Sequence, residues 1–250
     1  MVLAQFDAMR FFQIYVIQGF IGFFFLFLAW RIIQRGRKGL NRNLSIFYIL
    51  SGVGVILNIV YASLSVEGLE PLVLGIHFIT NYLVAFSIIF LVIFELILFK
   101  TSQVFSKKRE LRLVLMYACI LAGSAIFLFF ENWGIKINVS TDWKPVWYLP
   151  YFIYMLVVGT IGGTIPLFYY AFIIYRDIKD ENIKRKWTYY IIGSSFLITF
   201  QYGVYIANYL DIAIFRTVWL IIAVFLILIG SSLIYYGIGR QIDKKNKKTL

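Results

Sequence analysis

Seven long apolar runs dominate the pattern of hydrophobic and polar positions along the chain. They cover approximately residues 11–33, 44–66, 72–99, 113–131, 148–175, 187–210 and 214–238. Each has about 20 or more residues, the length that an α-helix needs to cross about 30 Å of hydrocarbon. Barrel strands would instead alternate polar and apolar residues over about ten positions. The runs lack that alternation, so the pattern predicts an all-α membrane protein, a bundle of seven transmembrane helices.

Composition favours lipid as the solvent for much of the chain. Of the 250 residues, 61% are hydrophobic and 14% are charged, whereas a soluble domain is about 45–50% apolar and about 25% charged. Backbone amides in lipid find no water to bind, which leaves helices as the spanning structure for such long runs. We expect a single membrane domain over residues 1–250, ending in a short basic tail at 240–250.

The positions of lysine and arginine predict the orientation of the spans. Segments 31–42, 100–112, 176–186 and 240–250 each hold five of the 24 basic residues, and the other four are Arg10, Lys136, Lys144 and Arg216. Loops on the cytoplasmic side carry the excess of basic residues. We therefore expect a multi-pass protein of the cell membrane with its N-terminus outside and its C-terminus in the cytoplasm.

The net charge of +12 raises the question of an acidic partner. The charge is spread over loops beside the spans, and no soluble domain carries it. That distribution fits attraction to anionic lipid of the inner leaflet rather than binding of nucleic acid. The basic residues expected to face lipid or a cytoplasmic partner are Arg35, Arg37, Lys38, Lys107, Lys108, Arg109, Lys184, Arg185 and Lys186.

Hydrogen-bonding side chains gather in the halves of the spans that we expect to be outer. His77 is the single histidine, and Asn81 lies four residues later, on the same helix face as His77 and Thr80. A convergent polar cluster of this kind predicts a pocket that opens outward. The residues predicted to line it are His77, Asn81, Gln18, Asn58, Tyr154, Gln201, Tyr205 and Asn208, with Gln13, Tyr61 and Tyr151 nearby.

The same side chains have a second interpretation. Polar groups in membrane bundles also hydrogen-bond between helices, at about 0.6 kcal/mol per bond. The sequence does not fix which face of each helix points inward. Both interpretations therefore stay open at this level.

Two features suggest a switch within the bundle. Glu95 is the single acidic residue in the interior of a predicted span, about a turn and a half from Lys100. We expect its carboxylate to reach headgroup water or to pair with a basic neighbour, and the alternative is a switch residue that couples helix motion to the cytoplasmic side. Pro166 follows the glycine-rich segment 159–165 and predicts a kink, which suits either a moving helix or static packing.

Enzyme mechanisms fail for lack of the necessary residues. The predicted spans contain no aspartate, and the motif HExxH is absent. One histidine and one cysteine cannot build a usual zinc site, and the seventh run has no lysine for a retinal Schiff base. We expect a protein without enzyme activity, metal or cofactor.

The chain resembles the seven-transmembrane sensor region at the N-terminus of some histidine kinases. The resemblance is carried by Arg35-Gly36-Arg37-Lys38 after the first span, by Tyr175-Arg176-Asp177 before the short charged loop 179–186, and by Tyr235-Tyr236-Gly237-Ile238-Gly239-Arg240 at the end of the last span. It covers most of the chain through hydropathy and basic loops. It implies ligand sensing without catalysis. Family members usually continue into an output domain, so here it implies a separate cytoplasmic signalling protein.

Three functions remain open. The preferred one is a receptor-like sensor that binds a small molecule in the outward pocket and signals through a separate partner. The second is a small-solute transporter of three-plus-one-plus-three helix design, suggested by the similarity of residues 48–52 to residues 190–194. The third is a structural subunit of a membrane complex.

Overall fold

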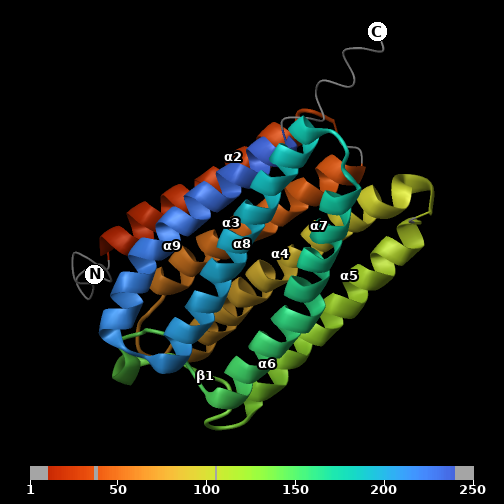
Figure 1. Cartoon of the computed structure of the whole chain (residues 1–250). Helices are drawn as coiled ribbons and strands as arrows, with labels where there is room; N and C mark the ends of the chain where they lie inside the picture. Colours follow the sequence, from red (N-terminus) through yellow and green to blue (C-terminus); the bar gives the residue numbers. More distant parts are fainter. Residues whose placement is uncertain (1–10, 37–38, 105, 240–250) are drawn as a thin grey trace.

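Seven helices that are long and apolar enough to cross a membrane lie side by side in the structure (Figure 1). This computed structural model describes residues 11–36, 39–104 and 106–239, with side chains for 11–36, 39–99 and 106–238. The spans are Phe12–Ile33, Gly39–Ser63, Glu70–Phe99, Lys107–Phe129, Leu149–Asp177, Glu181–Leu210 and Ala213–Ile238. The predicted seven-helix fold class is confirmed. Several helices begin before their apolar runs, because long basic side chains at a helix end keep their charge in water.

Most spans combine an α-helix with a shorter irregular turn. The first is the π-helix η2 (Phe12–Gln18) and α2 (Gly19–Ile33), and the fourth is α5 (Lys107–Ala122) and the 3-10 helix η3 (Gly123–Phe129). The fifth is α6 (Leu149–Gly159), the π-helix η5 (Thr160–Thr164) and α7 (Ile165–Asp177). The second, third, sixth and seventh are α3 (Gly39–Ser63), α4 (Glu70–Val104), α8 (Glu181–Leu210), and α9 (Ala213–Ile234) with the π-helix η6 (Tyr235–Gly239).

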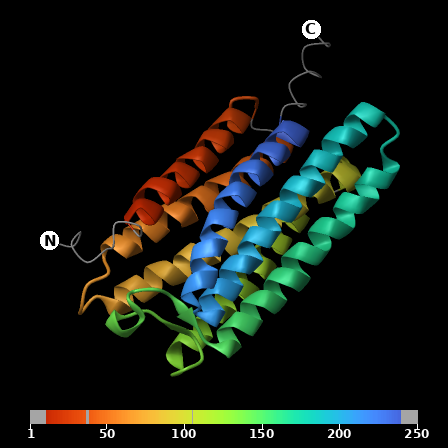
Figure 2. The ribbon, with the colours of Figure 1, turned by 60° about the vertical axis from the view of Figure 1, so that its left-hand side comes forward.

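The two ends of the bundle differ in structure. One end, named here the loop face, carries the connections 64–69, 130–148 and 211–212. Its longest connection holds a two-stranded antiparallel sheet of β1 (Ile135–Lys136) and β2 (Val146–Trp147), with the 3-10 turn η4 (Val139–Thr141) between them (Figures 1 and 2). The opposite end, named the basic face, carries the short connections 34–36, 106 and 178–180 among the described residues. The longest connection of the described chain therefore lies over the bundle at the loop face.

The third span forms the centre of the bundle. Of its most apolar window 61% is buried, against 17% for the fourth span. The helix α4 packs against α3, α5 and α7, and its stretch Ala85–Phe94 is buried on nearly every side. A helix that is apolar all round belongs in a core or in lipid. The peripheral α5 instead exposes Leu111, Leu115 and Met116, as expected of a helix that faces lipid.

Glycine allows α8 and α9 to approach at backbone distance. A Cβ atom built on Gly193 would lie 2.5 Å from the carbonyl oxygen of Gly230, and one built on Gly230 would lie 2.9 Å from that of Gly193. Membrane helices associate through this kind of small-residue contact. The α8–α9 pair forms one wall of the region described below.

The segment before Pro166, where a kink is predicted, contains a π turn. The amide of Ile165 donates to the carbonyl of Thr160, and Pro166, which has no amide hydrogen, is the second residue of α7. The hydroxyls of Thr160 and Thr164 lie 2.8 and 2.7 Å from the hydroxyl of Tyr202 on α8. These bonds hold the irregular turn against a neighbouring helix.

Candidate functional site

A cavity of about 1210 Å³ opens at the loop face. Its walls come from η2 and α2, α3, α4, α8 and α9, and the segment 139–145 of the longest connection also lines it. Along α8 and its C-cap it extends from Asp211 down to Phe200, a helix length of about 17 Å. The cavity thus reaches a little more than a third of the way along α8.

The structure brings most of the predicted pocket residues to this one cavity. They are Gln18, Asn58, His77, Asn81, Gln201, Tyr205 and Asn208, and the neighbouring Gln13, Tyr61 and Thr80 line it as well. They come from four different spans, so the polar faces of those spans do converge. That these groups bind a ligand stays a prediction.

Tyr154 was placed wrongly, because it does not line the cavity. Its hydroxyl donates to the carbonyl of Ile120 at 2.5 Å, and its ring packs 5.3 Å from the ring of Phe127. Tyr151 is fully buried, edge-on to Trp147 at 4.9 Å. The rotation of α6 turns Tyr154 toward the fourth span, and the sequence pattern does not determine that rotation.

Several cavity side chains also pair with one another. The Asn58 amide donates to Gln18, which joins α3 to η2 of the first span, and the Gln201 amide donates to the Tyr205 hydroxyl within α8. Thr80 and Asn81 are largely buried. Interhelical hydrogen bonding and cavity lining, the two interpretations of the polar cluster, therefore occur together at Asn58 and Gln18.

His77 connects the third span to the longest connection. Its Nε2 lies 2.9 Å from the amide nitrogen of Asn81 and 3.4 Å from the indole nitrogen of Trp147. An indole N–H can only donate, so Nε2 accepts and the ring hydrogen resides on Nδ1. The Tyr61 ring meets the imidazole edge-on at 5.1 Å. The geometry holds His77 as a neutral ring in the cavity wall.

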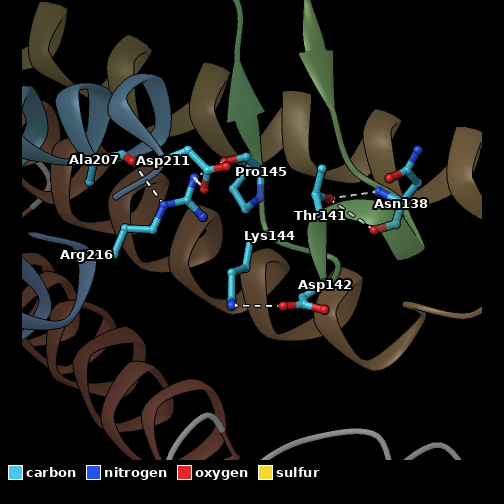
Figure 3. Close-up of polar contacts among 8 residues, drawn as sticks. All are labelled: Asn138, Thr141, Asp142, Lys144, Pro145, Ala207, Asp211 and Arg216. Carbon is cyan, nitrogen blue, oxygen red and sulfur yellow. Dashed lines mark hydrogen bonds and ion pairs between the residues drawn. The ribbon is translucent and has the colours of Figure 1, made fainter. Parts of the chain in front are cut away.

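Arg216 fixes the segment that covers the cavity, and sequence reasoning missed it. It lies in the first turn of α9 and donates to the carbonyl of Ala207 at 3.0 Å and to that of Pro145 at 2.7 Å (Figure 3). Its guanidinium also pairs with Asp211 at 3.1 Å. Arginine suits such a role because its planar group offers five donors. The sequence predicts only that Arg216 is one of the few basic residues on the outer side, and it indicates no contact for it.

The covering segment, residues 138–147, has a defined internal structure. Asn138 and Thr141 form a reciprocal capping box around η4, and Lys144 pairs with Asp142 at 3.3 Å (Figure 3). Asp142 and Trp143 adopt positive φ angles of 50° and 55°. Trp143 is 7% exposed, so burial of its ring supports this tight turn. The segment is an ordered cover and not a loose loop.

The floor of the cavity is narrow. A separate void of about 30 Å³ lies next to it and shares Val55, Val84, Phe200 and Gln201 with its lining. In this void the Ser51 hydroxyl donates to that of Ser87 at 3.1 Å. Among the described residues below it the core is formed by closely packed side chains, with Phe25, Phe47, Ile93 and Phe94 buried. On α8 the lining of the large cavity ends at Phe200 and Gln201.

Glu95 was predicted wrongly as an interfacial carboxylate. Its side chain is 0% exposed, and neither carboxylate oxygen has a hydrogen-bond partner within the described structure. The Tyr190 hydroxyl of α8 faces it outside hydrogen-bonding geometry. Because α4 is the central helix, a residue near its basic end still faces the core. The polar groups are therefore not confined to the cavity half of the bundle.

Replacing Glu95 by glutamine is expected to keep the fold, with a melting temperature equal to or above that of the wild type. An amide costs less to bury than a carboxylate of the same shape. Thermal unfolding of the purified protein in detergent checks this. A melting temperature lowered by ten degrees or more would show that the carboxylate itself stabilises the bundle.

The predicted basic residues lie at the basic face wherever the structure describes them. Lys107, Lys108, Arg109 and Arg185 are exposed. Several others are engaged: Arg35 contacts Tyr235 through its hydroxyl and its ring, and Lys184 lies near Glu181 and over Tyr175. Lys186 is partly buried. Arg37, Lys38 and the tail 240–250 lie outside the described residues.

Comparison with family models, with curated proteins and with solved structures finds no match for this chain. The resemblance to the sensor region of histidine kinases therefore stays an expectation. Within the described residues no group of three His, Cys, Asp or Glu side chains comes together as a metal-binding set.

Proposed function

We propose that this multi-pass membrane protein is a receptor-like sensor, not an enzyme, which binds a small molecule in the cavity at the loop face and signals through a separate partner at the basic face. The observation that carries the proposal is a cavity of about 1210 Å³ lined by polar groups from five spans. Ligand sites are concave and combine apolar walls with a few convergent polar groups. This cavity has both.

The charge distribution supports an outward position for the loop face. Connections at that face carry Glu67, Glu131, Asp142 and Asp211 against Lys136 and Lys144. The described connections of the basic face and the helix ends beside them carry Arg31, Arg35, Arg42, Lys107, Lys108, Arg109, Arg112, Arg176, Lys179, Lys184, Arg185 and Lys186. Under the positive-inside rule the basic face lies in the cytoplasm of the cell and the cavity opens outward.

The closed floor favours a sensor over a carrier. A carrier needs a polar path that reaches both faces in turn. Below Gln201 the void is only about 30 Å³, and about 20 further residues of α8, or about 30 Å, lie between this level and the basic face. The three-plus-one-plus-three carrier is further disfavoured by packing, because α2 packs closely against α3 whereas α7 touches α8 much less.

Ligand binding is tested by a stability screen of the purified protein. A diverse set of several hundred small solutes is added and the melting temperature is measured, with Asn208→Leu as the cavity variant. The matched control is Asn182→Leu, which changes the same residue type on α8 at an exposed position of the basic face. At least one solute should stabilise the wild type and the control but not Asn208→Leu. A set without any such solute contradicts the proposal.

Transport is tested with the same solutes. The protein is reconstituted in liposomes, and uptake of each stabilising solute is measured in radiolabelled form. Uptake equal to that of empty liposomes is expected. Sustained uptake that disappears in Asn208→Leu would replace the sensor by a carrier.

The signalling partner is tested at the basic face. A photo-crosslinking amino acid replaces Lys108, which is exposed there, or Phe129, which is 84% exposed at the other end of the fourth span. Crosslinking in the native membrane should yield a discrete protein adduct with a signalling domain from position 108 and none of that kind from position 129. Lipid adducts alone at both positions would contradict signalling through a protein partner.

A further inference from the structure

We propose that the cavity selects an uncharged ligand that carries several hydroxyl, amide or similar hydrogen-bonding groups together with an apolar surface. This inference names the ligand class and rests on the proposed ligand-binding function. It follows from where charge is placed in the cavity, from how the charged groups are already used, and from the mixed polar and apolar character of the lining.

Charge is confined to the rim of the cavity. Among the described residues that line it, the charged ones are Glu67, Asp142, Lys144, Asp211 and Arg216. All five lie in connections of the loop face or in the first turn of α9. The side chains of Asp142 and Asp211 are 79% and 48% exposed, and they therefore remain hydrated. A charged ligand deeper in the cavity would find no charge of opposite sign among these residues, which is costly within a membrane.

Arg216 already uses much of its guanidinium within the protein. Its Nε and Nη2 donate to two backbone carbonyls, and Nη2 also pairs with Asp211. A carboxylate or phosphate ligand that took the Nε and Nη2 donors would have to displace these contacts and release the covering segment. Lys144 is held near Asp142 at the exposed edge. The two basic residues of the cavity lining are thus engaged by the protein itself.

His77 does not supply a positive charge either. Its Nε2 accepts from Trp147 and faces the Asn81 amide. A second ring proton would place N–H groups against each other at this nitrogen. The ring is 2% exposed and remains part of the wall. Charge complementarity to an anion is therefore absent at this depth.

The wall offers neutral hydrogen-bonding groups of both kinds. Gln18, Asn58, Gln201 and Asn208 carry amides, each with two donor hydrogens and an acceptor oxygen. Tyr205 adds a hydroxyl. Amides and hydroxyls match ligands that both donate and accept, such as polyols, sugars or nucleosides. A site built to bond such groups rejects analogues that cannot satisfy them.

The lining also contains apolar side chains. Ile14, Ile17 and Ile21 line the cavity from the first span, and Val224 and Ile227 line it from α9. Such side chains contribute by removing apolar ligand surface from water. The volume of about 1210 Å³ exceeds the roughly 300–1,000 Å³ typical of small-molecule sites. A ligand of disaccharide or glycoside size with both polar and apolar surface fits this lining.

The test divides the stability screen by charge. Equal numbers of neutral polar, anionic and cationic solutes of matched size are used, including phenyl β-glucoside, phenyl β-glucuronide and phenyl β-glucosaminide as a set that differs mainly in charge. Stabilisation that is lost in Asn208→Leu and retained in Asn182→Leu defines cavity binding. The best binder is then remade with one hydroxyl replaced by a carboxylate or by an ammonium group.

Cavity binders are expected among the neutral solutes, and their charged analogues should bind about a hundredfold more weakly. In Asn208→Leu the neutral binder should lose about tenfold in affinity. An anionic or cationic solute that binds the cavity as tightly as its neutral analogue would overturn the inference and leave the sensor proposal standing. A screen without any cavity binder would overturn both.

Discussion

Gly193→Leu is expected to abolish the folded bundle, and Gly193→Ala is expected to lower the free energy of unfolding by about 3 kcal/mol. The alanine Cβ would lie 2.5 Å from the carbonyl oxygen of Gly230 and 3.0 Å from the backbone nitrogen of Ile234. Both atoms belong to the backbone of α9, so no side chain can move aside. The two helices must separate, which opens the cavity wall that they form. Monodisperse protein recovered by size-exclusion chromatography, together with the melting temperature, measures the effect.

Gly75→Ala is the matched control, because it makes the same change inside a helix. A Cβ at Gly75 meets nothing within 4 Å. Alanine there should leave stability unchanged or raise it by about 0.5–1 kcal/mol, since glycine is the poorer helix former. Equal behaviour of Gly193→Ala and Gly75→Ala would show that α8 and α9 do not meet at backbone distance.

Arg216→Ala is expected to release the covering segment and to lower the free energy of unfolding by about 2–3 kcal/mol. The arginine side chain is 16% exposed, and its loss leaves the carbonyls of Ala207 and Pro145 without their donor. The exposed carboxylate of Asp211 contributes little to this figure because water screens it. Hydrogen–deuterium exchange of the backbone amides in residues 138–147 should become at least tenfold faster, and thermal unfolding gives the stability.

Lys144→Ala provides the comparison for the covering segment. Its ion pair with Asp142 joins side chains that are 45% and 79% exposed, and such pairs contribute about 0–1 kcal/mol. Exchange in residues 138–147 should stay within about twofold of the wild type. If Arg216→Ala leaves exchange unchanged as well, the arginine does not hold the segment over the cavity.

Hydropathy predicted the spans well because lipid imposes one simple requirement on every spanning segment. The same requirement kept polar side chains rare, so those that remained were informative. Asn58, Gln201 and Asn208 were found by their polarity alone, and they share one cavity in the structure. Their convergence could be expected because all three lie in the halves of α3 and α8 that are nearer the loop face.

The sequence did not predict the rotation of each helix about its axis, or which helices pack against each other. Tyr154 and Tyr151 lie at the same depth as the cavity residues, yet the rotation of α6 directs one toward the fourth span and buries the other. Glu95 lies near the end of α4 at the basic face, and its carboxylate was predicted to reach water there. The central position of α4 buries it completely. Both outcomes depend on which helix becomes central, a property of the packed bundle that no single segment encodes.

The covering segment was the least accessible to sequence reasoning. In this segment Trp147 is 1% exposed and its indole nitrogen contacts His77, a contact that hydropathy does not indicate. Arg216 holds this segment through backbone carbonyls, which carry no sequence signature. The sequence signal that could have identified this role is Arg216 itself, a lone arginine at the start of an apolar helix. A buried arginine needs several hydrogen-bond acceptors, so its partners could have been sought among neighbouring backbone carbonyls.

The central claim, a cavity that opens outward and closes above the basic face, is tested most directly by cysteine accessibility along α8. In a Cys119→Ser background, single cysteines replace Asn208 in the cavity and Ser194 below its floor, where the serine is 2% exposed. A charged, membrane-impermeant thiol reagent is applied to intact cells and to inverted membrane vesicles. Cysteine at 208 should react in intact cells only, and cysteine at 194 should react from neither side. Reaction at 194 from the cytoplasmic side, or no reaction at 208 in intact cells, would contradict the account.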